Sequence, residues 1–538
     1  MKSIARTSAF ALLFGALLAL CAPFLQSPLI FDDLHAFRAG ALESMSSQGG
    51  QFAPRAWVFE TFALTSKVFN DTLLWMRFGN LLAHVGVSFV LYLLIRRLLH
   101  DLDKAPDKFL GKDAAAMLSA AFFAIHPLAI YTQAYLVQRT IICATLFALL
   151  SLYSFWRGLG GSRASLWLSL PLFAVSIMAK EHVVMMPFVA ALLWVLYKRS
   201  AAVQNHSVRE VAIVLLLQLT LSVLVILSFR WWLVANPYEQ LTGEMLQGEL
   251  NLPQEMLYPL SVLNQLGLFF KYLGLWLLPN PAWLSVDMRE AFPLGFGDPM
   301  LWLGPLVFVG YMLGGGLLLW RGGAVGLLGL AVLIPGVLFA TELSTVRLQE
   351  CFVLYRSYLW MPGAFIALAL GLCRLRRMLV LLVPVMMLFF VALSFDRLSV
   401  LSRPQLVWLE ARDLLERSGE GPGVLGGYRI YYNVGVTLEE IGRSEEALEN
   451  YNQALARNPT YTMAYLNRGI IYLNQKNWSA ALADFDKAIE LVPVFFKAYL
   501  GKAQALEGVG RADEARQVLQ QACDLGAGAI CEKLQAQK

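Results

Sequence analysis

Long apolar runs separated by short polar loops dominate residues 1–398. A helix needs about 17 to 25 predominantly apolar residues to cross a bilayer, and many of these runs have that length. We therefore predict a bundle of membrane-spanning helices. The predicted spans lie near residues 9–30, 72–95, 113–134, 138–156, 164–180, 183–197, 209–235, 299–320, 324–341, 359–373 and 378–395.

Basic residues cluster in every second loop, and they predict the orientation, because loops rich in lysine and arginine stay in the cytoplasm. These residues are Arg96, Arg97, Lys104, Lys108, Lys112, Arg157, Arg163, Lys198, Arg199, Arg374, Arg376 and Arg377. The apolar segment Leu260–Leu278 breaks the alternation, since a full crossing there would move Arg374 to the outside. We predict a re-entrant or interfacial segment instead, which gives eleven crossings and an external C-terminus.

The first apolar run follows Lys2 and Arg6, as in a signal peptide, and Leu18–Cys21 resembles a lipoprotein cleavage site. Leu20 is large for the small-residue position of such a site, and the apolar character continues to about Phe31. We expect an uncleaved first helix.

The pattern changes in residues 428–538, where apolar positions recur with a period of 34 residues, typical of tetratricopeptide repeats. The first repeat carries Tyr431, Gly435, Leu438, Ala447, Tyr451, Ala454 and Pro459, and a shift of 34 gives Tyr465, Gly469, Tyr472, Ala481, Phe485, Ala488 and Pro493. We predict three repeats plus a C-terminal cap, joined to the membrane domain by a linker or capping helix at 399–427. Such a solenoid binds a peptide or partner protein, or acts as a stabilising cap or dimer contact.

Composition agrees with a membrane protein: 58% of the 538 residues are hydrophobic, only 15% are charged, and the mean hydropathy is +0.57. The net charge of +5 comes without a dense basic patch, which argues against nucleic-acid binding. None of the six cysteines has zinc-site spacing. Cys523 and Cys531, eight residues apart, either form a disulfide or pack as free thiols.

Asp32, Asp33 and His35 follow the first span directly. A carboxylate is costly in hydrocarbon, so we place this pair in headgroups or a watered cavity. A solvated acidic turn is the simpler interpretation of one aspartate. Two adjacent carboxylates favour a catalytic role, because repulsion lets one bind a proton while the other holds a cation or a hydroxyl group.

Further charged residues lie at span ends that the predicted topology places outside, where the positive-inside bias disfavours cations. The predicted phosphate-binding residues are His126, Arg139, Lys180, Glu181, Arg356 and Tyr358, with Arg347 and Glu350 in the same loop as Arg356. Each also has a structural interpretation: His126 as a helix-end histidine, Arg139 and Lys180 as snorkelling side chains, and Lys180 and Glu181 as a neutral pair. His84, beside Asn80, is predicted to be a core histidine.

Several segments resemble, in order, the transmembrane-and-tetratricopeptide O-mannosyltransferases and their bacterial relatives. The matching segments are 31–33, 54–62, 80–84, 126–128, 135–139, 179–181, 284–287 and 355–359, followed by the repeats. The resemblance implies an all-α C-type glycosyltransferase fold and a polyprenyl-phosphate-linked sugar as donor. It also implies Asp32 or Asp33 as general base, with His126, Arg139, Lys180 and Arg356 around the donor phosphate. The chain departs from the family at Pro54-Arg55 and at Trp360, which puts donor or acceptor specificity in question.

We therefore expect an inverting glycosyltransferase at the outer face of a bacterial inner membrane, with its repeats in the periplasm. Its acceptor would be a hydroxyl group of a secreted or pilus-like protein, and His35, Arg55 and Asp287 are candidate acceptor contacts. The alternatives are an oligosaccharyltransferase with a lipid diphosphate donor, a non-enzymatic tetratricopeptide adaptor, and a transporter. The sequence predicts no certain cofactor and leaves a divalent cation at the aspartates open.

Overall fold

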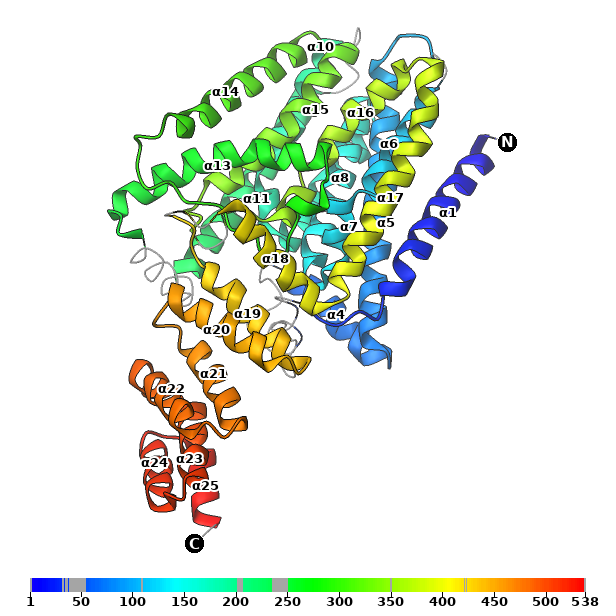
Figure 1. Cartoon of the computed structure of the whole chain (residues 1–538). Coiled ribbons are helices and arrows are strands. Elements are labelled where there is room, and N and C mark those ends of the chain that lie inside the picture. Colours follow the sequence, from blue (N-terminus) through cyan, green and yellow to red (C-terminus); the bar gives the residue numbers. More distant parts are fainter. Residues whose placement is uncertain are drawn as a thin grey trace. The chain divides into compact units, whose positions relative to one another are not determined.

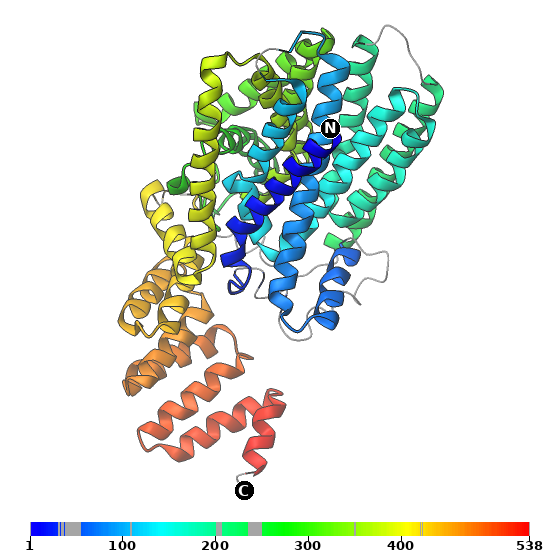
Figure 2. The same cartoon turned by 90° about the vertical axis from the view of Figure 1, so that its right-hand side faces the viewer.

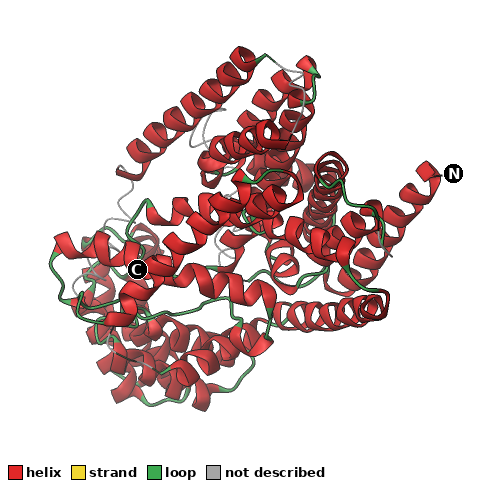
Figure 3. Ribbon diagram, turned by 90° about the horizontal axis from the view of Figure 1, so that it is seen from above, coloured by secondary structure: helices red, strands yellow, loops and turns green. Residues whose placement is uncertain are grey.

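The computed structural model describes residues 2–30, 33, 37, 55–107, 110–200, 207–234, 250–348, 351–419, 421 and 423–536. These residues form helices and loops without a strand, as Figure 3 shows. Contacts divide the chain into two units: Met1–Val286 with Glu290–Pro404, and Asp287–Arg289 with Gln405–Lys538. The predicted all-α class is confirmed.

The first unit is built from long helices joined by short 3-10 turns (Figure 1). Its elements are α1 (Lys2–Cys21), η1 (Ala22–Phe24), α4 (Ala56–Val68), α5 (Thr72–Leu102), α6 (Lys112–Ala124), α7 (Pro127–Ala134), η2 (Leu136–Gln138), α8 (Arg139–Leu159), α9 (Arg163–Ala179), η3 (Glu181–Met185), α10 (Met186–Ser200), α11 (Val208–Val234), α13 (Gln254–Leu277), η4 (Pro281–Trp283), α14 (Pro299–Trp320), α15 (Gly323–Phe339), η5 (Ala340–Leu343), η6 (Leu354–Tyr358), α16 (Pro362–Arg374), η7 (Arg377–Leu381) and α17 (Leu382–Leu401).

Eight helices among the described residues are long and apolar enough to cross a membrane, or nine if the bent pair α6 and α7 counts as one. Three shorter apolar helices, Phe10–Phe24, Arg163–Ala179 and Pro362–Arg374, accompany them. Each of the eleven predicted spans coincides with one of these helices. The number of actual crossings stays a prediction.

α13 meets the length and composition of a span, but it runs across Figure 1, whereas α5, α6 and α17 run down it. Whether α13 crosses the membrane or forms the predicted re-entrant or interfacial segment stays a prediction. Elsewhere in the unit neighbouring helices lie side by side: α8 packs on α5 and α9, and α5 packs on α6 (Figure 2).

The bend between α6 and α7, 53°, has a local cause in the pair His126-Pro127. Pro127 has no N–H to donate and forces the preceding residue out of the helical region. His126 is accordingly extended, with φ −69° and ψ 132°. Its imidazole then caps α7 by accepting the backbone N–H of Leu128.

The second unit consists of α18 (Pro404–Ser418), α19 (Gly427–Glu440), α20 (Ser444–Arg457), α21 (Thr462–Asn474), α22 (Trp478–Leu491), α23 (Phe496–Gly508), α24 (Ala512–Asp524) and α25 (Gly528–Ala536). α18 lies within the predicted linker. The pairs α19 with α20, α21 with α22 and α23 with α24 repeat as the period of 34 predicts.

Small residues allow the two helices of a repeat to cross closely. A Cβ atom on Gly435 would lie 2.6 Å from the ring of Tyr451, and one on Gly469 would lie 2.9 Å from the ring of Phe485. Both rings are buried. The repeat pattern therefore has a direct packing cause.

Cys523 and Cys531 are joined by a disulfide that ties α24 to α25, with the Cα atoms 5.0 Å apart. The sequence left open whether these two cysteines form a disulfide or pack as free thiols, and the structure has the disulfide. Disulfides persist mainly in oxidising compartments.

Candidate functional site

Charged side chains gather in the first unit where α9, α15 and the segment before α4 meet the short helices η3, η5 and η6. Lys180 and Glu181 connect α9 to η3, Glu342 lies in η5, and Arg356 lies in η6. Arg55 immediately precedes α4. These residues come from three distant parts of the sequence, near positions 55, 180 and 350, and folding brings them together.

Arg55 and Glu181 form a two-point ion pair. The Nε atom of Arg55 donates to Oε2 of Glu181 at 3.0 Å, and its Nη2 atom donates to Oε1. The backbone N–H of Arg55 donates to the carbonyl of Met178 at 2.8 Å. Arg55 has φ 69°, an uncommon left-handed conformation for a residue with a side chain. The backbone hydrogen bond to Met178 and the side-chain hydrogen bonds to Glu181 together fix the orientation of Arg55.

Glu342 is the centre of a second set of ion pairs and is only 1% exposed. Its Oε2 atom lies 3.0 Å from Nη1 of Arg356 and 3.5 Å from Nε of Arg347. Its Oε1 atom lies 3.7 Å from Nε2 of His182, whose Nδ1 atom lies 3.2 Å from Glu181. The two carboxylates are thus linked through His182 into one continuous cluster.

Lys180 adds a further cation, and its side chain is buried among polar and aromatic groups. Its Nζ atom donates to Oε1 of Gln138 at 3.3 Å and lies 5.0 Å from the ring centre of Tyr355. Lys180 follows α9 and precedes the candidate span that begins at Glu181. Burial, with a smaller contribution from Arg55, lowers the pKa of Lys180 to about 7.

We call Arg55, Lys180, Glu181, His182, Glu342, Arg347 and Arg356 the ion cluster. Among the described residues it holds four lysine or arginine side chains and two carboxylates. Lys180 and Arg356 are buried, whereas the side chains of Arg55 and Arg347 are 36% and 22% exposed. Unbalanced charge is costly away from water, and an anionic group of a ligand would offset it. Arginine offers paired donors to phosphate, while lysine offers a compact charge.

Asp33 is buried and caps the turn that leads into α8. Its Oδ2 atom accepts the backbone N–H of Leu136 at 3.2 Å, and its Oδ1 atom accepts that of Val137 at 2.9 Å. Hydrogen bonds of this kind favour the ionised carboxylate. The position of the side chain is thus determined by η2, and Asp33 is a structural cap whatever else it does. Asp32 and His35 lie outside the described residues, as does Glu350.

Arg77 is a buried cation that the sequence analysis did not single out. It donates to the carbonyls of Ala134, Ser27 and Pro28 at 2.6, 3.0 and 2.9 Å. It thereby fixes the segment that leads from the first helix toward Asp33. Its signal in the sequence was an arginine inside the apolar run 72–95.

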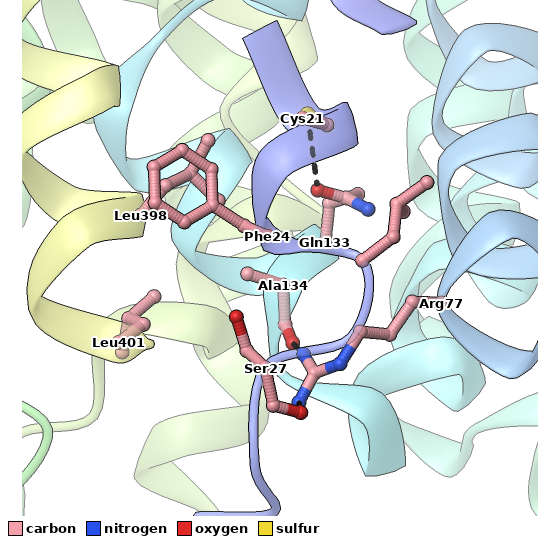
Figure 4. A pocket seen from close by; sticks show the side chains of 9 residues that line it. Cys21, Phe24, Ser27, Arg77, Gln133, Ala134, Leu398 and Leu401 are labelled. Carbon is pink, nitrogen blue, oxygen red and sulfur yellow. Dashed lines mark hydrogen bonds between the residues drawn. The ribbon is translucent and has the colours of Figure 1, made fainter. Parts of the chain in front are cut away.

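A small pocket lies beside Arg77, lined by Cys21, Phe24, Leu25, Ser27, Arg77, Gln133, Ala134, Leu398 and Leu401 (Figure 4). In Figure 4 the guanidinium group of Arg77 points toward Ser27 and Ala134. The volume of about 10 Å³ accommodates at most about one water molecule. The pocket is too small for a substrate.

The structure gives His126 a structural role in place of the predicted contact with phosphate. Its Nε2–H donates to the carbonyl of Trp276 at 3.0 Å, and its Nδ1 atom accepts the N–H of Leu128 at 3.3 Å. The ring also stacks on Trp276 at 4.3 Å between ring centres. Because both nitrogens are used, we withdraw His126 from the candidate phosphate ligands.

Arg139 needs the same correction. It donates to the side chains of Asn80 and Thr61, each at 2.8 Å, and to the carbonyl of Met76 at 2.5 Å. Its guanidinium carbon lies 3.7 Å from the ring centre of Phe62. These contacts join α4, α5 and α8, so Arg139 acts as a structural clamp.

Tyr358 is also part of the core. Its hydroxyl lies 2.6 Å from Nδ1 of His84, and Nε2 of His84 lies 2.9 Å from the carbonyl of Ala124. The carbonyl requires Nε2 to be the donor, so the Tyr358 hydroxyl donates to Nδ1. The predicted core role of His84 is confirmed, and Tyr358 is withdrawn as a donor contact.

Asp287 belongs to the second unit, where its carboxylate lies 2.6 Å from Nη2 of Arg289. Among the described residues, no group of three His, Cys, Asp or Glu side chains has the arrangement of a metal site. Of the predicted site residues, Arg55, Lys180, Glu181 and Arg356 belong to the ion cluster.

Glu342 was missed by the sequence analysis, although it is the most connected carboxylate of the cluster. The available signal was a carboxylate at the end of the apolar run 324–341. Arg347 and His182 were noticed as neighbours of candidate residues but were not proposed as ligands. Their importance depends on contacts across the fold.

Comparison with known proteins identifies the repeats. The tetratricopeptide repeat family model matches residues 432–494 and 477–530, which confirms the predicted repeats. A UDP-N-acetylglucosamine–peptide N-acetylglucosaminyltransferase of Giardia intestinalis is 36% identical over 66 residues, which are 12% of this chain and 4% of that protein. Human tetratricopeptide repeat protein 6 is 38% identical over 61 residues, 11% of this chain and 12% of that protein.

A solved structure gives a similar partial match. The crystal structure of MamA protein matches with 20% identity and a TM-score of 0.19, covering 25% of this chain and 81% of that one. The chain spans 4% and 12% of the length of the two curated relatives named above. The family model places the likeness to known proteins in the tetratricopeptide repeats, residues 432–494 and 477–530.

Proposed function

We propose that this protein is a membrane glycosyltransferase that moves a sugar from a polyprenyl-phosphate-type donor to a hydroxyl group of a protein. The observation that carries the proposal is the gathering of Lys180, Arg347 and Arg356 in one cluster, with Lys180 and Arg356 buried. A lipid-linked sugar brings a phosphate group, and it reaches its enzyme through the membrane. The cluster lies among candidate membrane helices, where such a donor would arrive.

In the proposed reaction a carboxylate, Asp32 or Asp33, takes the proton from the acceptor hydroxyl. The hydroxyl oxygen attacks the anomeric carbon of the sugar, and the bond from that carbon to the phosphate oxygen breaks. The electron pair of the broken bond leaves with the lipid phosphate. Lys180, Arg347 and Arg356 stabilise the negative charge that develops there.

Because Asp33 already accepts two backbone N–H groups, we favour Asp32 as the base and Asp33 as the residue that positions the loop. Because Arg55 is held by two hydrogen bonds to Glu181, we assign the donor phosphate to Lys180, Arg347 and Arg356. The proposal retains the C-type glycosyltransferase fold, on the strength of the ordered sequence resemblance and the helices that coincide with its spans.

We place the protein in a bacterial inner membrane, with the ion cluster and the repeats at the outer face. The support is the distribution of basic residues at the opposite helix ends, where Arg96, Lys112, Lys198 and Arg374 lie. α17 then returns the chain to the outer side before the repeats begin. The Cys523–Cys531 disulfide is of the kind found in oxidising compartments.

The repeats would recruit the protein acceptor, since tetratricopeptide solenoids present an extended concave surface. An oligosaccharyltransferase with a lipid diphosphate donor is the close variant, because either donor presents phosphate to the same cations. A pure adaptor would have no use for the buried cations Lys180 and Arg356.

The test compares the intact masses of secreted proteins in cells that carry the wild type, Asp32→Asn or Asp33→Asn. Lys67→Gln is the control, since Lys67 is an exposed cation on α4 outside the ion cluster. We expect the loss of one defined sugar mass in Asp32→Asn and an unchanged mass in Lys67→Gln. Unchanged masses in both aspartate variants, at equal membrane levels, would contradict the proposed reaction and favour the adaptor.

A further inference from the structure

Glu342 poses an electrostatic problem within the proposed phosphate site. Its carboxylate is 1% exposed and lies within 3.5 Å of both Arg356 and Arg347. Those two guanidinium groups are also the proposed ligands of the donor phosphate. The site therefore contains an anion of its own that interacts with the same cations.

The second carboxylate of the cluster, Glu181, is occupied differently. It is held by two hydrogen bonds from Arg55 and lies 3.2 Å from His182. Glu342 has no such bidentate partner among the described residues: its Oε2 atom lies near Arg356 and Arg347, and its Oε1 atom lies 3.7 Å from His182. Glu342 thus distributes its charge over three neighbours.

A buried carboxylate near a phosphate-binding site has two opposing effects. It repels the phosphate, and it offers the arginines an alternative partner when the phosphate leaves. Without it, Arg356 and Arg347 would lose this competing carboxylate and would hold a dianionic lipid phosphate more tightly. Product release is a common limit on turnover, so tight retention of the leaving group would slow the enzyme.

We infer that Glu342 is a positioning residue whose negative charge lowers the affinity of the ion cluster for the lipid phosphate and speeds its release. The inference rests on the proposed function and adds a role for a residue that does not contact the sugar. When the donor binds, Arg356 moves its hydrogen bond, and Arg347 its ion pair, from Glu342 to the phosphate, and both return to Glu342 when the product leaves. Charge, more than shape, is the property of Glu342 that matters.

Two substitutions separate charge from shape. Glu342→Gln keeps the size of the side chain and one hydrogen-bond acceptor but removes the charge, whereas Glu342→Asp keeps the charge and shortens the side chain. If charge governs affinity, Gln changes phosphate binding and Asp leaves it near that of the wild type. If Glu342 only fills space, Asp is the more damaging substitution.

The measurement is the affinity of the purified full-length protein in detergent for farnesyl phosphate, with farnesol as the uncharged control ligand. We expect Glu342→Gln to bind farnesyl phosphate about tenfold more tightly than the wild type, the size of one charged hydrogen-bonding interaction. Glu342→Asp should stay within about twofold of the wild type. In a transfer assay, Glu342→Gln should lower both kcat and the KM for the donor.

A second pair of variants keeps the inference testable if Glu342→Gln alone does not fold. Arg356→Gln removes the partner at 3.0 Å and should weaken binding of farnesyl phosphate. Adding Glu342→Gln to it removes the then unbalanced carboxylate and should restore part of the affinity, because a buried charge without its partner is the costly state.

Unchanged or weaker binding by Glu342→Gln, with a normal melting temperature, would overturn the inference, as would a double variant no tighter than Arg356→Gln. A wild type that binds farnesyl phosphate no better than farnesol would instead contradict the proposed phosphate site itself. The two failures are therefore distinguishable.

Discussion

The ion cluster of the first unit and the pair Arg468–Asp484 of the second unit show two uses of buried charge. Arg468 donates to both carboxylate oxygens of Asp484, at 2.8 and 2.6 Å, and joins α21 to α22. One cation meets one anion there, and every charge is balanced within the protein. In the ion cluster, by contrast, four cations of the described residues share two carboxylates.

This difference indicates that the Arg468–Asp484 pair has a structural role and that the ion cluster has a ligand-binding role. A balanced pair stabilises the contact between two helices and needs no ligand. An unbalanced cluster costs free energy when it is buried, so it is retained where a ligand supplies the missing charge. The ratio of cations to carboxylates therefore distinguishes the proposed site from the Arg468–Asp484 pair better than burial does.

The largest expected effect comes from removing a cation of the cluster. Lys180→Gln should lower the transfer rate at least about 100-fold, the usual cost of losing one preorganised group that stabilises charge in the transition state. The melting temperature should change little, because the neutral amide can still contact Gln138. Sugar transfer at a fixed donor concentration measures the effect, and a loss below about threefold would show that Lys180 is not part of the site.

A smaller effect, on stability alone, is expected in the balanced pair. Arg468→Gln leaves the carboxylate of Asp484, whose side chain is 6% exposed, without its main partner. We expect a loss of about 1 to 2 kcal/mol of repeat stability, below the range for fully buried pairs because the Arg468 side chain is 20% exposed. Hydrogen exchange of α21 and α22 in the full chain measures it. Affinity for farnesyl phosphate should not change.

The double variant Arg468→Gln/Asp484→Asn sharpens the comparison. Removing both charges should recover most of the lost stability, since no unpaired charge remains. Continued instability of the double variant would mean that the pair contributes more than charge balance.

The disulfide gives another prediction about stability and location. Cys523→Ser opens the link between α24 and α25 and should destabilise this end of the repeats by about 2 to 3 kcal/mol, near the lower end for a disulfide because the closed loop is short. Hydrogen exchange in α24 and α25 measures the loss. Alkylation of the wild type without a reductant should leave Cys523 and Cys531 unmodified, and modification of both in freshly isolated membranes would contradict an oxidising location.

The smallest expected effect is the pH dependence of phosphate binding. Because the pKa of Lys180 is lowered to about 7, its neutral form increases as the pH rises through that value. A phosphate group favours the charged amine, so binding takes up a proton and the affinity for farnesyl phosphate should fall severalfold between about pH 6.5 and 8.5. Lys180→Arg stays charged and should lose this dependence. Equal pH profiles for the two proteins would contradict the role of Lys180.

The fold was largely predictable because its signals are local. Apolar runs predicted the helices of the first unit, and the period of 34 residues predicted the pairs of the second. Gly435 with Tyr451 and Gly469 with Phe485 show why: each pair lies within one repeat, at a spacing that the helix crossing requires.

The candidate site was only partly predictable. The sequence located Lys180, Glu181 and Arg356 because charged residues at span ends are uncommon. It could not tell that His126 and Arg139 use their nitrogens on backbone carbonyls and neighbouring side chains, because those contacts join distant segments. Glu342 escaped notice for the same reason, since its partners are brought to it only by the fold.

The most direct test of the excess-charge account is the binding of farnesyl phosphate and farnesol to the purified wild type, Arg356→Gln and Arg468→Gln. The account predicts that the wild type and Arg468→Gln bind the phosphate at least about tenfold more tightly than the alcohol, and that Arg356→Gln loses most of this preference. Equal affinity of the wild type for the phosphate and the alcohol, or an equal loss in Arg356→Gln and Arg468→Gln, would contradict it.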